Sequence, residues 1–174
     1  MENVVGIIDM DGYRIQKQFL CKELGLLKVG EDTASSFFFD IRVRSSDLDE
    51  KDARSCRYVK KHIHKLPLGV PYGTMAYTIE TLEELVLKFY EGIKKNGMST
   101  LAYKGGIFER DLLKRLGIPS VNLECFGCPK AEALFDALVW LETCGNHTEL
   151  NAYKHCAKVE VEAFGQWLTN QTHC

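Results

Sequence analysis

The chain has 174 residues, of which 45% are hydrophobic and 26% charged, as expected for one globular domain with its own core, spanning residues 1–174. Its net charge is −2, which excludes nucleic-acid binding through overall basicity, so any such surface must be local. The sequence shows neither a secretory signal nor a run near the ~18 apolar residues of a membrane span. We therefore expect an intracellular protein, cytoplasmic or nuclear, without membrane contact.

Three apolar, β-prone segments follow one another at the start of the chain. They cover residues 4–8, 19–29 and 35–43, and a turn-forming Gly30 separates the second from the third. Short connections between neighbouring strands favour an antiparallel meander. A charged segment, residues 46–61, follows, and Ser46 before Asp47 is typical of a helix start.

The rest of the chain alternates between strand and helix patterns. Residues 66–73 contain two prolines and two glycines and predict a loop. Helices are then expected at 82–93, 108–116, 131–141 and 153–168, with strands at 99–103 and 120–123. The predicted fold class is α/β, with a mixed central sheet flanked by helices.

Carboxylates form the first candidate site. Asp9 and Asp11 follow the first predicted strand and point to the same side, because strand side chains alternate. Paired carboxylates are suited to Mg²⁺ or Mn²⁺, although Asp-x-Asp-Gly is also ordinary turn chemistry. Glu109 follows a Gly-Gly pair that would let a substrate backbone come close. The alternative for Glu109 is a helix-start residue favoured by the helix dipole.

The last predicted helix supplies two more candidates. Glu160 falls within a face that otherwise contains Cys156, Val159 and Phe164, whereas Glu162 is expected on the opposite side. A carboxylate on an apolar face requires a partner or a metal, unless it reaches solvent at the rim. His155 points about 100° away from Cys156 on a helix and suits a general base, or it is a surface residue without function.

Cysteine and histidine form the second candidate site. The chain contains seven cysteines, and in a reducing compartment clustered Cys and His favour a metal over a disulfide. Cys144, His147 and Cys156 have the ligand types and spacing of a zinc clamp. A competing site joins Cys125 and Cys128 to the same region, and a third possibility is buried thiols without metal. No role is assigned to the remaining cysteines, which are Cys21, Cys56 and Cys174.

Two local basic clusters are candidates for phosphate contact. One includes Lys60 and Lys61, and the other includes Lys104 and Arg110. Either cluster taken alone is also typical of a solvated surface.

The acidic residues together resemble the RNase H-like exonucleases of the DEDDh type. Asp9-Met-Asp11 stands where that family has Asp-x-Glu, Phe108-Glu109 where it has an Asp after Phe, and His155-x4-Glu160 where it has His-x4-Asp. Three of the four acids differ from the family's usual choice by one methylene. The resemblance implies a cleft in which these residues hold Mg²⁺ or Mn²⁺ and His155 is the base.

A closer resemblance is to the Maelstrom domain of the piRNA pathway, an offshoot of the same fold. That domain holds zinc with Glu, Cys, His and Cys, and Cys144, His147 and Cys156 match the last three. The resemblance implies Glu23 as the fourth ligand, because residues 19–28 look like that domain's second strand. The Gly127-Cys128-Pro129 motif is also similar to one in uncharacterised invertebrate and mobile-element proteins.

Three functional hypotheses follow from the sequence. The first is a metal-dependent nuclease that cleaves single-stranded RNA or DNA, as the retained acidity at all four positions favours. The second is a catalytically silent, zinc-stabilised module that binds RNA or a protein partner, in a silencing role like that of Maelstrom domains. A third hypothesis, an unrelated zinc-stapled interaction domain, offers no reason for Glu160 on an apolar face.

Overall fold

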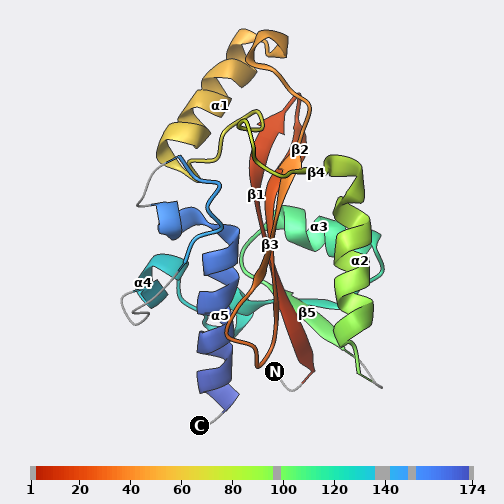
Figure 1. The fold of residues 1–174 in the computed structure, drawn as a ribbon. Coiled ribbons are helices and arrows are strands. Elements are labelled where there is room, and N and C mark those ends of the chain that lie inside the picture. The colour runs from red at the N-terminus through yellow and green to blue at the C-terminus, as the bar shows by residue number, and fades with distance from the viewer. Residues whose placement is uncertain (1–2, 96–98, 136–141, 149–151, 173–174) are drawn as a thin grey trace.

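A six-stranded mixed sheet forms the centre of the molecule (Figure 1). The computed structural model describes residues 3–95, 99–135, 142–148 and 152–172. The strands are β1 (Val4–Ile15), β2 (Gln18–Lys28), β3 (Ser35–Asp40), β4 (Tyr77–Thr78), β5 (Thr100–Tyr103) and β6 (Ser120–Asn122). Their spatial order is β4-β3-β2-β1-β5-β6. The pairs β1–β2 and β2–β3 are antiparallel, and the β1–β5, β5–β6 and β3–β4 pairs are parallel.

Helices cover both faces of this sheet. They are α1 (Glu50–His62), α2 (Leu82–Ile93), α3 (Ile107–Arg115), α4 (Ala131–Phe135) and α5 (Ala157–Thr172). Helices α4 and α5 pack on one face, whereas α2 and α3 pack on the other. Helix α1 lies at the far end of β1, where Cys56 packs against Tyr13 and Ile15. The α/β class, the meander and the flanking helices are confirmed.

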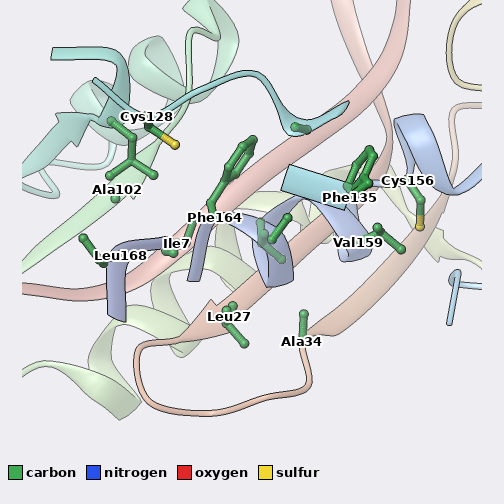
Figure 2. Packing of buried hydrophobic residues seen from close by; sticks show 14 residues of the cluster. Ile7, Leu27, Ala34, Ala102, Cys128, Phe135, Cys156, Val159, Phe164 and Leu168 are labelled. Atoms are coloured by element: carbon green, nitrogen blue, oxygen red, sulfur yellow. The ribbon is translucent and has the colours of Figure 1, made fainter. Parts of the chain in front are cut away.

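Alternation along β1 divides the core into two layers. Ile7 faces α5 and joins Leu27, Val159 and Phe164 in one buried cluster, shown in Figure 2. Ile8 and Met10 face the opposite way, toward α2 and α3. Because side chains repeat with a period of two, Asp9 and Asp11 extend the row of Ile7 and face α5.

The first strand is longer than the sequence predicts, so Asp9 and Asp11 lie inside β1 rather than after it. The β1–β2 hairpin closes at Gln16 and Lys17, which both have positive φ angles of 49° and 67°. Positive φ at both central residues is the geometry of the tight hairpin turns that match strand twist. The expected β3 extension to residue 43 is wrong, because Arg42 has a φ of 54° and ends the extended run.

Several helix boundaries also differ from the predictions. Helix α1 starts later than expected, because Asp49, rather than Ser46, accepts a hydrogen bond from the amide of Asp52. A short 3-10 helix, Ala152–His155, precedes α5, which starts only at Ala157. The second half of the predicted helix 131–141 lies outside the described residues. Among the helices that the structure describes, none combines the length and apolarity needed to cross a bilayer.

Candidate functional site: a buried Glu-Cys-His-Cys group beside an acidic group

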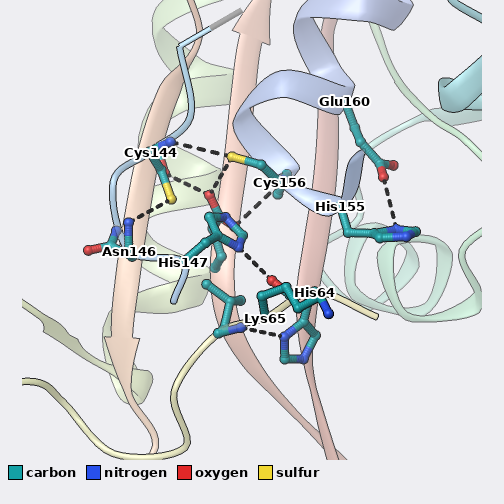
Figure 3. Close-up of polar contacts among 12 residues, drawn as sticks. His64, Lys65, Cys144, Asn146, His147, His155, Cys156 and Glu160 are labelled. Carbon is teal, nitrogen blue, oxygen red and sulfur yellow. Dashed lines mark hydrogen bonds and ion pairs between the residues drawn. The ribbon is translucent and has the colours of Figure 1, made fainter. Parts of the chain in front are cut away.

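The predicted zinc ligands come together in space (Figure 3). One ligand atom from each of Glu23, Cys144, His147 and Cys156 lies within 4.8 Å of the other three. Glu23 lies on β2. Cys144 and His147 lie in the segment before α5, and Cys156 is the residue directly before α5. Residues more than 130 positions apart in the sequence thus form one group that could hold a metal ion.

A close approach between β2 and α5 positions this group. A side-chain carbon on Gly25 would lie 2.3 Å from the carbonyl oxygen of Ala157, so only glycine permits this contact. The approach brings the amide of Ala157 to 3.4 Å from Oε2 of Glu23, which accepts its hydrogen bond. The negative carboxylate therefore lies at the N-terminus of α5, where the helix dipole stabilises it.

The imidazole of His147 is oriented for a cation. Its Nδ1 lies 2.5 Å from the carbonyl oxygen of His64, which only accepts hydrogen bonds, so Nδ1 carries the proton. In the neutral ring, Nε2 is then a bare lone pair 3.1 Å from Oε2 of Glu23, without a hydrogen bond among the described residues. Two buried acceptors facing each other need a positive charge between them. A metal ion or a second ring proton meets this need.

Without a metal, protons occupy this role. Burial alone would lower the pKa of His147, but its contacts with Cys156 and Glu23 raise that pKa to about 10. At Glu23, burial acts to raise the pKa. Its contacts with His147 and Cys156 outweigh burial and lower this pKa below the ordinary value. The donor set therefore supplies one carboxylate, one imidazole and two sulfurs, which fits a closed tetrahedral site for Zn²⁺.

A second histidine supports the first. His64 is buried, its Nε2 donates to the carbonyl of Gly12, and its Nδ1 accepts from the amide of Leu66. Burial lowers its pKa to about 4, so the ring stays neutral. The sequence does not predict this role of His64, because a hydrogen bond to its backbone carbonyl leaves no sequence signature.

Four candidate carboxylates lie on three different elements. Asp9 and Asp11 come from β1, Glu109 from the first turn of α3 and Glu160 from the first turn of α5. Oε1 of Glu109 accepts a hydrogen bond of 3.0 Å from the amide of Met10, between the two aspartates. The parallel strand β5 pairs with β1 only as far as Ile7. Glu109 therefore accepts the hydrogen bond of a β1 amide that lies beyond the end of this pairing.

Gly106 has a different role from the one that the sequence indicates. A side-chain carbon at this position would lie 1.5 Å from Oε2 of Glu109. The missing side chain therefore makes room for the Glu109 carboxylate itself to fold back onto β1, where the sequence suggested space for a substrate.

The acidic group carries more negative charge than its surroundings compensate. Burial and then the neighbouring Glu160 raise the pKa of both Asp9 and Asp11 well above the ordinary value. Burial raises the pKa of Glu109 to about 7 and that of Glu160 to about 8. Oδ2 of Asp11 and Oε2 of Glu109 are buried and have no hydrogen-bond partner among the described residues. Buried polar atoms without a partner require an explanation, and a bound cation is one that suits carboxylate oxygens.

The four carboxylates do not converge in the way that the ligand atoms of Glu23, Cys144, His147 and Cys156 do. We call these four residues the metal-type group. Of the residues that the structure describes, only Glu23, Cys144, His147 and Cys156 bring three or more ligand atoms within 4.8 Å of one another. The acidic group is thus an electrostatic cluster rather than a second set of three or more converging ligand atoms.

His155 points away from the metal-type group and toward Glu160, as Figure 3 shows. Its Nδ1 lies 4.0 Å from Oε1 of Glu160. Burial lowers the pKa of His155, so at neutral pH the imidazole can accept a proton. The prediction that His155 and Glu160 share one helix is wrong, because His155 ends the preceding 3-10 helix. Glu162, expected on the outer side of α5, is buried and accepts a hydrogen bond from the amide of Ala34.

The two predicted basic clusters differ in their pairing. Lys104 lies 3.2 Å from a carboxylate oxygen of Glu124, and Arg110 pairs with its neighbour Asp111. Lys60 and Lys61, in the last turn of α1, are exposed and form no ion pair with any described residue.

The competing zinc site is not assembled. Cys125 is exposed at the end of the 3-10 helix Leu123–Phe126, and neither it nor the buried Cys128 belongs to the metal-type group. Cys21 and Cys56 are buried free thiols, and Cys174 lies outside the described residues.

The fold and the site together define an α/β protein with a buried Glu-Cys-His-Cys group beside an acidic group. Comparison with protein-family models, curated proteins and solved structures finds no match to this chain. The function is therefore inferred from the geometry of these two groups.

Proposed function

We propose that this protein is a nuclease-like domain that cleaves single-stranded RNA or DNA with Mg²⁺ or Mn²⁺. The observation that carries the proposal is the acidic group around Asp9 and Asp11 of β1. Asp9, Asp11, Glu109 and Glu160 come from three elements, and two of their buried oxygens are unpaired. A protein keeps such uncompensated charge where a cation or substrate supplies the missing partner.

The residues fit divided roles. The carboxylates of Asp9, Asp11, Glu109 and Glu160 would hold the divalent ions, which lower the pKa of bound water and stabilise charge on the phosphate. His155 accepts the proton from the attacking water, because its lowered pKa keeps it neutral at pH 7. Its 4.0 Å distance to Glu160 places this base beside the acidic group.

We further propose that the Glu-Cys-His-Cys group holds a structural Zn²⁺. Thiolate and imidazole ligands favour zinc, and four protein ligands leave no open position for chemistry. His147 donates its other ring proton to a backbone carbonyl, which is the usual outer partner of a metal-bound histidine. The clamp would tie β2, the segment before α5 and α5 itself into one unit.

We also propose that the fold is RNase H-like and of the Maelstrom type. In support, the parallel strands β5 and β6 join the antiparallel strands β1, β2 and β3 on the far side of β1, while the short strand β4 adds to the other edge beside β3. Glu23 lies on the second strand, at the position that the resemblance to the Maelstrom domain implied.

Degradation of labelled single-stranded RNA and DNA with Mg²⁺ or Mn²⁺ tests the nuclease function. We expect Asp9→Asn to lower the rate at least 100-fold, because it removes a carboxylate from the metal-holding group. The matched control is Asp32→Asn, at an exposed aspartate in the β2–β3 turn, which should leave the rate unchanged. Equal rates for wild type and Asp9→Asn would exclude this group as the active site.

The spacing of the carboxylates favours a second candidate function. Among the described residues their oxygens do not converge as the ligand atoms of the metal-type group do, and three of the four acids differ by one methylene from the exonuclease pattern. A catalytically silent module that binds RNA or a protein partner in a silencing role fits this observation. Binding of RNA without any metal-dependent cleavage would support this alternative.

A further inference from the structure

One part of the chain differs sharply in charge from the rest. Residues 53–79 contain five lysines and arginines and no aspartate or glutamate, within a protein of net charge −2. This basic segment comprises most of α1, the connection after it, strand β4 and the first residue of the following 3-10 helix. In Figure 1 it runs from the far end of the β1–β2 hairpin across the sheet toward β4.

Three of the five cations of this segment are available to a ligand. Arg57, Lys60 and Lys61 are exposed and have no ion-pair partner among the described residues. Arg57 and Lys60 line a cavity of about 320 Å³ whose other walls include Tyr13 from β1 and Leu68 from the connection after α1. Helix α1, strand β1 and the connection after α1 therefore all contribute to the lining of this cavity.

Exposed aromatic rings accompany these cations. Tyr58 on α1 is 59% exposed and lies against His62, with 4.9 Å between ring centroids. Tyr72 is fully exposed, and Met75 is 89% exposed. Free aromatic rings among unpaired cations are the combination by which proteins bind single strands, because bases stack on the rings while cations contact phosphates.

The segment is fixed to the strand that carries the acidic group. The hydroxyl of Tyr13 donates to the carbonyl of Leu66 at 2.5 Å, and Nε2 of His64 donates to the carbonyl of Gly12. Gly12 directly follows Asp11. These buried contacts attach the basic segment to β1 next to the first two acids.

We propose that the basic segment is a binding track for single-stranded nucleic acid, with Lys60 and Lys61 on the phosphates and Tyr58 and Tyr72 under the bases. The identity of the ligand rests on the proposed function. A single strand is favoured over a duplex, because paired bases do not offer their faces to a side chain. It is favoured over an anionic membrane, because the exposed apolar groups, among them Tyr58, Tyr72 and Met75, lie on separate elements rather than on one amphipathic helix face.

Fluorescence anisotropy with a labelled single-stranded oligonucleotide tests the track. The zinc-loaded full chain is used without Mg²⁺ or Mn²⁺, so that binding is measured apart from cleavage. We expect the double variant Lys60→Glu/Lys61→Glu to weaken binding at least 10-fold and to reduce its salt dependence, since fewer counterions are released. Lys88→Glu, a charge reversal at an exposed site on α2, is the matched control and should bind as wild type.

The tyrosines provide a second readout. Tyr58→Ala is expected to weaken binding to single strands at least 5-fold but not to the matched duplex, and Tyr58→Phe should recover the affinity because it keeps the ring. Circular dichroism and zinc content verify that each variant folds.

Equal affinity for wild type and the double variant would overturn the proposal. Binding to phosphatidylserine vesicles without binding to oligonucleotides would also overturn it and identify a membrane surface. The two proposals can fail separately. If no cleavage is observed but binding weakens in the double variant as expected, only the nuclease function is excluded. Conversely, if cleavage depends on Asp9 but the substitutions at Lys60 and Lys61 leave the affinity unchanged, only the binding track is excluded.

Discussion

Asp11 and Glu23 lie directly opposite each other on β1 and β2. Glu23 belongs to the metal-type group and Asp11 to the acidic group, so the two groups share one pair of facing residues. Glu23 contributes to the raised pKa of Asp11, and His147 lowers it. The charges on Glu23 and His147 therefore change the pKa of Asp11 in the acidic group. The structural site and the candidate active site are electrostatically coupled in this way.

Metal analysis of cysteine variants tests the clamp. Wild-type protein is expected to contain about one zinc per chain, and Cys144→Ser to lose most of it, because a thiolate ligand is replaced by a hydroxyl. The loss should lower the unfolding free energy by several kcal/mol, measured by urea denaturation. Cys125→Ser is the control, since Cys125 is exposed and lies outside the group. Unchanged zinc in Cys144→Ser, or a loss in Cys125→Ser, would contradict the assignment.

Gly106→Ala tests how Glu109 reaches β1. The added methyl would lie 1.5 Å from Oε2 of Glu109, so the carboxylate must leave the amide of Met10. We expect a loss of about 1–3 kcal/mol in urea denaturation, as for other overpacked sites. Gly92→Ala on α2 is the matched control, because nothing lies within 4 Å of its added carbon. That helical substitution should be neutral or stabilise by about 0.5–1 kcal/mol. Similar effects of both substitutions would show that Glu109 is free to move.

The sequence predicted the features that side-chain chemistry encodes directly. Cys144, His147 and Cys156 were recognisable by type and spacing, and helix α2 by its apolar repeat. The length of β1 was not predictable in this way, because its hairpin turn consists of Gln16 and Lys17, without the glycine or asparagine that usually marks such turns. The contact between Gly25 and Ala157 depends on the packing of distant elements, which no local pattern records.

The raised pKa values in the acidic group predict that the stability of the protein depends on pH. Glutamate has an ordinary pKa of 4.5, but the values for Glu109 and Glu160 in the folded protein are about 7 and about 8. Between pH ~4.5 and ~8 the native state therefore binds more protons than the unfolded state, so the unfolding free energy falls as pH rises. Glu160→Gln should flatten this fall when urea denaturation is repeated at each pH without added Mg²⁺ or Mn²⁺. Parallel curves for the two proteins would show that Glu160 titrates normally.

Asp11→Asn separates a functional role from a structural one. Oδ2 of Asp11 is buried without a hydrogen-bond partner, and burial and Glu160 raise the pKa of this carboxyl. If Asp11 only supported the fold, replacing its carboxyl group would lower the unfolding free energy of the protein. A residue kept for binding a cation is expected to cost stability when that cation is absent. We therefore expect Asp11→Asn to raise the unfolding free energy by about 1 kcal/mol without added Mg²⁺ or Mn²⁺, and to lower nuclease activity.

The control for this substitution is Asp32→Asn, whose exposed side chain should change stability by less than about 0.5 kcal/mol. Adding Mn²⁺ should stabilise wild type more than Asp11→Asn, since binding to the native state shifts unfolding by mass action. Loss of stability in Asp11→Asn, together with an equal Mn²⁺ effect on both proteins, would make Asp11 a structural partner of Glu23. The acidic group would then have no metal-binding role at its junction with the clamp.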